Sequence, residues 1–198
     1  MVELGSGTST KTRHILDAKL KTGLPLNYIP LDVSDILIPT SEQLLKDYSN
    51  LTINGIISEY ITGYRIVKDI DPSPNLTIFL GSSIGNFRRA YIKEFLTKIA
   101  NVMHDDDALL IGFDLIKDED VLLRAYNDRD GLTAEFNLNI LHRINNELGS
   151  SFDLNKFEHV SIFNREKSRI EMHLISKEDQ TVDIKDIDLR VNFKKGET

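Results

Sequence analysis

The 198 residues are enough for one well-formed hydrophobic core, or for one domain with a smaller appendage. The formal net charge of −7 argues against a nucleic-acid backbone as the main partner, and the absence of cysteine excludes disulfides, a thiolate nucleophile and cysteine-ligated zinc. Because the sequence has neither a signal-peptide pattern nor an apolar run of about 18 residues, we expect a cytoplasmic protein without a membrane partner.

Short apolar runs alternate with amphipathic stretches over the first 115 residues. The runs show little polar alternation, which is typical of strands covered on both faces. The clearest helix is predicted at 89–103, where apolar residues recur at helical spacing. The alternation predicts a doubly wound, mostly parallel α/β sheet, with strands at 1–4, 26–34, 51–58, 76–83 and 108–115.

The pattern changes after about residue 116. Residues 118–149 are expected to be helical, with an apolar stripe formed by Leu132, Phe136, Ile140, Ile144 and Leu148. Two later segments, 168–175 and 187–193, alternate apolar and polar residues, which predicts antiparallel strands with one exposed face. We therefore expect a nucleotide-type α/β domain at 1–115 and an α+β appendage at 116–198.

A glycine turn, "GSG", follows the first predicted strand and precedes an expected helix. A dinucleotide fingerprint is matched at Gly5 and Gly7, but Thr10 stands in place of its third glycine. A P-loop is matched at Gly5, Lys11 and Thr12, but Thr10 again replaces a glycine. A β-branched residue resists the backbone conformations that cradle phosphates, so both interpretations are weakened.

A third interpretation is a site for S-adenosyl-L-methionine, which has no pyrophosphate and does not require the third glycine. Such a site needs a carboxylate at the end of the second strand for the ribose hydroxyls, and Asp32 lies 25 residues after Gly7. The acidic Glu3 suits the sulfonium and ammonium charges of this ligand. P-loop-like nucleotide binding and a strand–turn–helix that binds nothing remain alternatives.

Longer motifs extend through almost the whole chain in a characteristic order. They are "VELGSGTSTKTRHILDA", "YIPLDVS", "FLGSSIGNF", "LLIGFDLIKD", "AYNDRDGLTAEFNLNILHRINNELGSSFDL", "FEHVSIFN" and "RIEMHL". Together they closely resemble the histidine-specific N-methyltransferases, which convert histidine to its trimethylated betaine, hercynine, in ergothioneine biosynthesis. The resemblance implies a Rossmann-like class I methyltransferase sheet with an α+β substrate-binding appendage. It also implies S-adenosyl-L-methionine as cofactor and histidine as the small-molecule substrate.

The resemblance implies a cofactor site formed by Gly5, Gly7, Lys11, Asp32, Glu59, Tyr60 and Gly81. In the family the matching lysine lies beside the cofactor's carboxylate, and the matching aspartate binds the ribose. Glu59 and Tyr60 stand where the family has an Asp-Phe pair at the adenine, so this contact departs from the pattern. The backbone at Gly81 is expected to line the cofactor.

On the substrate side, the resemblance implies that Asn86 and Tyr126 hydrogen-bond the carboxylate end of the amino acid. An amide and a phenol suit this task, because they orient a carboxylate without a charge that would compete for the amine. The implied reaction is an in-line displacement that depends mainly on alignment. We therefore expect neither a catalytic acid–base residue nor a metal.

Compared with the family pattern, both ends of the sequence are short. The family carries a helical segment before the first strand and, after the position of residue 198, a segment that holds the imidazole. We therefore expect an incomplete sheet, with 108–115 or its neighbour at an exposed edge. We also expect cofactor binding with weak or no histidine methylation by this chain alone. A catalytically impaired cofactor-binding or assembly module is a further alternative.

Overall fold

The computed structural model describes residues 1–198, and their contacts divide the chain into two units, 1–114 and 115–198. Each unit has its own hydrophobic core. The sequence places the boundary after residue 115, and the roles that it assigns to the two parts stay predictions. No helix in the chain combines the length and the apolar character needed to span a lipid bilayer.

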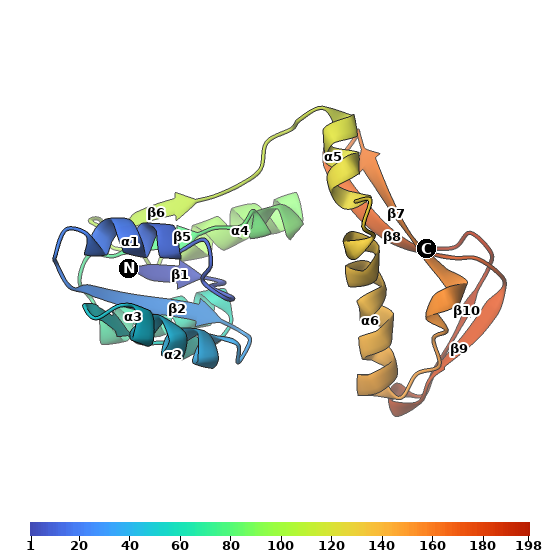
Figure 1. Cartoon of the computed structure of the whole chain (residues 1–198), viewed down its shortest axis with the longest axis horizontal. Helices are drawn as coiled ribbons and strands as arrows, with labels where there is room; N and C mark the ends of the chain where they lie inside the picture. Colours follow the sequence, from blue (N-terminus) through green and yellow to red (C-terminus); the bar gives the residue numbers. More distant parts are fainter. The chain divides into compact units, whose positions relative to one another are not determined.

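A six-stranded sheet forms the centre of the amino-terminal unit (Figure 1). Its strands run in the order β3-β2-β1-β5-β6, with β4 also paired to β2, and all of the pairings are parallel. The strands are β1 (Val2–Leu4), β2 (Leu26–Asp32), β3 (Leu51–Ile53), β4 (Ile56–Ile57), β5 (Leu76–Phe79) and β6 (Ala108–Ile111). The helices are α1 (Arg13–Leu20), α2 (Leu37–Asp47), α3 (Tyr60–Ile70), the 3-10 turn η1 (Ser83–Asn86) and α4 (Arg89–Ala100).

Both faces of this sheet are covered by apolar side chains. Neighbouring residues on a strand point to opposite faces, and in β2 Tyr28 and Ile29 are both fully buried. Ile29 belongs to a cluster with Tyr64 of α3 and Phe95 of α4, whereas Tyr28 belongs to a second cluster that includes Leu16 of α1. The predicted doubly wound, Rossmann-like sheet is therefore confirmed.

The strand order reverses beside β1. The chain moves outward from β1 to β2 and β3, then returns to β5 on the other side of β1 and continues to β6, which lies at the edge. In open parallel sheets, ligands bind in the crevice outside the carboxyl ends of the strands at such a reversal. The loops that follow β1 and β5 are therefore the expected place for a ligand.

The carboxyl-terminal unit contains two helices and two antiparallel strand pairs, β7–β8 and β9–β10. Its elements are α5 (Glu119–Tyr126), α6 (Leu132–Leu148), the 3-10 turns η2 (Leu154–Lys156) and η3 (Lys185–Ile187), β7 (Phe157–Asn164), β8 (Arg169–Ser176), β9 (Gln180–Ile184) and β10 (Leu189–Phe193). Its core gathers Leu141, Phe152, Phe157, Val182 and Ile184. The predicted antiparallel pairing is confirmed.

The segment 118–149, expected to be helical, consists of two helices, α5 and α6, with a break between them. Gly131 adopts a left-handed conformation with φ +74°, and the Asp128 carboxylate accepts hydrogen bonds from the first amides of α6. A carboxylate in this position satisfies amides that have no partner within the helix. The two residues thus define the start of α6, whereas α5 has already ended at Tyr126.

The predicted apolar stripe of α6 is only partly correct. Ile144 and Leu148 pack on the core, but Leu132 and Phe136 are 65% and 73% exposed. Leu141 is buried instead. The packed face of α6 is therefore rotated away from the amino-terminal half of the predicted stripe.

Several strands are shorter than predicted, for local reasons. The segment 51–58 divides into β3 and β4 at Gly55, where a Cβ would lie 2.3 Å from the side chain of Leu37. The strand predicted at 76–83 ends at Phe79, ahead of positive φ at Gly81 and Ser82. The strand predicted at 187–193 begins only after Asp188, whose φ is +49°.

Candidate functional site

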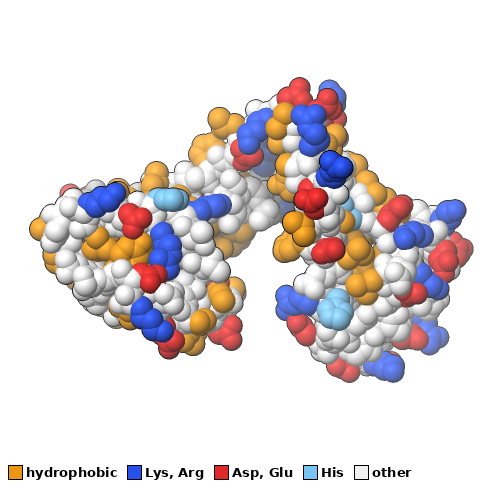
Figure 2. All heavy atoms as spheres, viewed as in Figure 1, with side chains coloured by type: hydrophobic (Ala, Val, Ile, Leu, Met, Phe, Trp, Pro, Cys, Tyr) orange, Lys and Arg blue, Asp and Glu red, His pale blue; other side chains and the backbone are white.

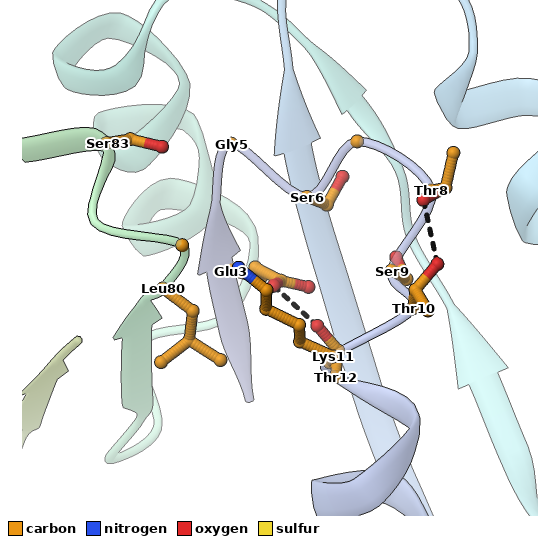
Figure 3. Close-up of a pocket in the computed structure, with 12 residues that line it drawn as sticks. Glu3, Gly5, Ser6, Thr8, Ser9, Thr10, Lys11, Thr12, Leu80 and Ser83 are labelled. Carbon is orange, nitrogen blue, oxygen red and sulfur yellow. Dashed lines mark hydrogen bonds between the residues drawn. The ribbon is translucent and has the colours of Figure 1, made fainter. Parts of the chain in front are cut away.

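A cavity of about 320 Å³ lies where the strand order reverses (Figure 3). The loop after β1 forms one wall, and the loop after β5 forms the other. The lining residues are Glu3, Gly5, Ser6, Gly7, Thr8, Ser9, Thr10, Lys11, Thr12, Leu80, Gly81 and Ser83. The cavity therefore combines four of the predicted cofactor residues: Gly5, Gly7, Lys11 and Gly81.

The glycine loop depends on left-handed backbone at both predicted glycines, with φ +70° at Gly5 and +48° at Gly7. The amide of Gly5 donates to the carbonyl of Leu31 at 2.7 Å, which ties the loop to β2. A Cβ on Gly5 would lie 3.0 Å from the hydroxyl of Tyr60, whereas a Cβ on Gly7 would meet no atom within 4 Å. Gly5 is thus required by packing as well as by conformation, and Gly7 faces open space.

Asp32, at the end of β2, holds the glycine loop from the side. Its carboxylate accepts hydrogen bonds from the amide of Gly7 at 2.8 Å and from the amide of Ser34 at 2.9 Å. A carboxylate has about four acceptor positions, so two remain after these contacts. Asp32 is not among the residues that line the cavity, and its predicted contact with a ribose stays a prediction.

A buried polar network lies beneath the glycine loop. Glu3 is 3% exposed and accepts hydrogen bonds from the hydroxyls of Thr12, at 2.5 Å, and Tyr28. The Tyr28 hydroxyl also lies 2.9 Å from the hydroxyl of Ser9, which has a left-handed backbone with φ +50°. Burial raises the pKa of the Glu3 carboxyl, and burial together with the neighbouring Glu3 raises the pKa of Tyr28. These contacts tie Ser9 and Thr12 of the loop to the strands β1 and β2.

Lys11 and Gly81 approach each other across the cavity. The Lys11 side chain extends from the loop back toward the end of β1 (Figure 3). Its ammonium nitrogen lies 3.5 Å from the position that a Cβ on Gly81 would occupy. Gly81 has φ +80°, a conformation that favours glycine, and an anionic group in the cavity would meet the positive charge of Lys11.

Tyr60 and Glu59 do not line the cavity. The Tyr60 ring packs among other aromatic rings, with centroids 5.4 Å from Phe79 and 5.8 Å from Phe95. Burial raises the pKa of its phenol, to which Asp32 also contributes. Glu59 is exposed, directly before α3. The structure therefore places the Tyr60 ring in the apolar core, with its hydroxyl next to Gly5. The role of Glu59 and Tyr60 at an adenine stays a prediction.

The predicted substrate residues lie in different units. Asn86 is exposed at the end of η1, the turn that begins with the cavity residue Ser83. Tyr126 is the last residue of α5 and is 38% exposed. Figure 2 shows acidic and basic side chains interspersed over the visible face of each unit. The substrate role of both residues stays a prediction.

Ser6 is a cavity residue that the sequence does not single out. It is 7% exposed, and its hydroxyl has no hydrogen-bond partner. A buried hydroxyl without a partner costs free energy, and Ser6 carries this cost in the wall of the cavity. Among the lining residues the cation of Lys11 suits the carboxylate of an amino-acid-like ligand, whereas the amide of Gly7 is already bound to Asp32.

Comparisons with known proteins match this chain to a methyltransferase family model and to several named proteins. A family model described as "Histidine-specific methyltransferase, SAM-dependent" matches residues 1–198. The chain is 41% identical over 198 residues to the histidine N-alpha-methyltransferase of Mycobacterium tuberculosis and 40% identical to that of Mycolicibacterium smegmatis. These matches cover all of this chain and 61% of each relative. Ergothioneine biosynthesis protein 1 of Schizosaccharomyces pombe is 30% identical over 189 residues, covering 92% of this chain and 24% of that protein.

Proposed function

Because the family model matches residues 1–198, this chain belongs to the histidine-specific, SAM-dependent methyltransferases, and we propose that it methylates the α-amino group of histidine. The donor is S-adenosyl-L-methionine, the product is hercynine, and the reaction belongs to ergothioneine biosynthesis. Two close relatives carry the name of this activity. The proposed compartment is the cytoplasm, in keeping with a sequence that has no cysteine.

The observation that carries this proposal is the cavity at the carboxyl ends of β1 and β5. Three of its features fit the methionine part of the cofactor. The ammonium of Lys11 suits the carboxylate, the acidic Glu3 suits the positive charges, and the unpartnered hydroxyl of Ser6 offers a hydrogen bond. Asp32 holds the glycine loop in the shape that leaves this cavity open.

The cofactor, when bound, supplies an electrophilic methyl group on a sulfonium. The residues of the chain then have to orient the histidine, remove water from its amine and keep that amine unprotonated. Asn86 and Tyr126 are proposed to bind the histidine carboxylate. Both are neutral, so they orient the substrate without adding a charge beside the attacking amine.

Calorimetric titration with S-adenosyl-L-methionine tests the cofactor part, and Ser6 and Ser41 provide a matched pair of variants. Both hydroxyls are buried without a hydrogen-bond partner, but only Ser6 lines the cavity, whereas Ser41 lies in α2. We expect Ser6→Ala to weaken binding about fivefold, the equivalent of one hydrogen bond. Ser41→Ala should bind as tightly as the unaltered chain.

Mass spectrometry of histidine incubated with the chain and the cofactor tests the reaction. Methylated histidine would support the proposed activity. Cofactor binding without methylated histidine would instead favour the alternative of a cofactor-binding module. Mg²⁺-dependent ATP binding that S-adenosyl-L-methionine does not displace would overturn the proposal in favour of a P-loop-like protein.

A further inference from the structure

Two side chains of β7 meet the last carbonyl of α5. The ring nitrogen Nε2 of His159 lies 2.9 Å from the carbonyl oxygen of Tyr126, and the hydroxyl of Ser161 donates to the same oxygen at 3.0 Å. His159 and Ser161 are two positions apart on the strand, so both point to the same face of β7. A carbonyl oxygen has two acceptor positions, and this pair occupies both.

These contacts provide hydrogen-bond donors for a carbonyl at the end of α5. The last carbonyls of a helix have no partner within the helix, and side chains such as histidine near the helix end satisfy them. Tyr126 is the last residue of α5, and Ser161 is only 6% exposed. Strand β7 therefore fixes the end of α5 at the residue to which a substrate contact is assigned.

The neighbours of His159 determine which ring nitrogen carries the proton. The side-chain nitrogen of Asn137 lies 3.1 Å from the backbone carbonyl of His173, which only accepts, so the amide must present its NH₂ group there. The same NH₂ group lies 3.0 Å from Nδ1 of His159. Nδ1 must therefore accept, so the neutral ring carries its proton on Nε2, which lies 2.9 Å both from the carbonyl of Tyr126 and from the hydroxyl oxygen of Ser161. The Ser161 hydroxyl donates its own proton to the Tyr126 carbonyl, so both side chains donate to that oxygen.

We propose that His159 is a positioning residue for histidine binding, which it supports by holding Tyr126 at the end of α5. The inference rests on the proposed function, since the substrate contact is assigned to the Tyr126 phenol. His159 acts through the backbone of Tyr126 and needs no contact with the substrate. Asn137 selects the tautomer that allows this, and Ser161 shares the carbonyl.

Two substitutions separate the hydrogen bond from the bulk of the ring. His159→Gln places an amide nitrogen near the position of Nε2, so the donor to Tyr126 is kept. His159→Asn is too short to reach the Tyr126 carbonyl, so this donor is lost. His142→Asn is the matched control, because His142 is an exposed histidine of α6 whose ring nitrogen Nε2 lies 3.1 Å from the side chain of Asn146 on the same helix.

The first measurement requires no substrate. Nitrogen NMR of the histidine rings should show the Nε2–H tautomer for His159. Hydrogen exchange should show that the amide of Asn127, which donates to the carbonyl of Leu123 at the end of α5, exchanges faster in His159→Asn than in His159→Gln. An Nδ1–H tautomer, or equal exchange in the two variants, would overturn the inference.

The second measurement follows histidine methylation. We expect His159→Asn to raise KM for histidine about fivefold, the equivalent of losing one hydrogen bond. The affinity for S-adenosyl-L-methionine should be unchanged, since its predicted residues lie in the other unit. His159→Gln should restore most of the KM, and His142→Asn should match the unaltered chain.

The two measurements separate the failure of the inference from the failure of the proposed function. An unaltered chain that neither binds nor methylates histidine would contradict the proposed function, while tautomer and exchange still decide whether His159 holds Tyr126. An active chain whose KM is insensitive to His159→Asn would overturn the positioning role alone.

Discussion

Replacing Gly5 by alanine should damage the glycine loop more than the same change at Gly7. Both residues have left-handed backbone, which costs a residue with a Cβ about 1–2 kcal/mol. At Gly7 this is the whole cost, because a Cβ meets nothing within 4 Å. At Gly5 the new Cβ would also lie 3.0 Å from the Tyr60 hydroxyl, and overpacking of this kind adds about 1–3 kcal/mol.

The excess cost at Gly5 should depend on one oxygen atom. After the Tyr60 hydroxyl, the next atom that the new Cβ would meet is Cε1 of the ring at 3.4 Å, which is an ordinary contact. In a Tyr60→Phe background, Gly5→Ala should therefore cost about as much as Gly7→Ala. The coupling free energy between positions 5 and 60 should account for most of the excess, about 1–3 kcal/mol.

Urea unfolding of the four variants measures this coupling. The chain has no tryptophan, so the transition is followed by circular dichroism, with hydrogen exchange of peptides from β1 and β2 to report on the amino-terminal unit. The single variants Gly7→Ala and Tyr60→Phe serve as controls. Equal losses for Gly5→Ala and Gly7→Ala, or additive effects of Gly5→Ala and Tyr60→Phe, would refute the packing argument.

Three further predictions concern titratable groups, each tested by urea unfolding over a pH series. Burial raises the pKa of Glu3 above its ordinary 4.5, so the protonated carboxyl adds to the free energy of unfolding below pH 4.5, and this added stability is lost as pH rises through the folded pKa. The stability of the unaltered chain relative to Glu3→Gln should therefore fall as pH rises over this window. Lys68→Met leaves the Asp107 carboxylate buried without its cation, because the two side chains are 7% and 0% exposed and lie 2.7 Å apart. We expect the free energy of unfolding to fall by about 3–5 kcal/mol and to be partly recovered on adding Asp107→Asn. An unchanged free energy of unfolding in Lys68→Met would contradict a stabilising ion pair. Hydrogen bonds from Thr133 and Leu132 lower the pKa of Asp128 to about 2, so Asp128→Ala should reduce stability near neutral pH, and the difference should vanish as pH falls through that value; a pH-independent difference would argue against the cap.

Local features of the sequence were sufficient for the sheet and the glycine loop. Uninterrupted apolar runs such as that of β2 require cover on both faces, and the two clusters around Tyr28 and Ile29 supply it. The glycine pair was equally informative, since a turn with positive φ at Gly5 and Gly7 favours residues without a Cβ. The two-residue alternation predicted one strand of each antiparallel pair in the second unit, β8 and β10, but it did not identify their partners β7 and β9.

Only the tertiary structure decided which residues meet across long separations in the chain. No local pattern places the Tyr60 hydroxyl against Gly5, leaves the hydroxyl of Ser6 without a partner, or brings His159 to the carbonyl of Tyr126. The exposure of Phe136 on a helix whose spacing predicts an apolar stripe has the same origin. Periodicity fixes how side chains are spaced around a helix or strand, but the packing of whole elements determines which of them are buried and which atoms come within hydrogen-bonding distance.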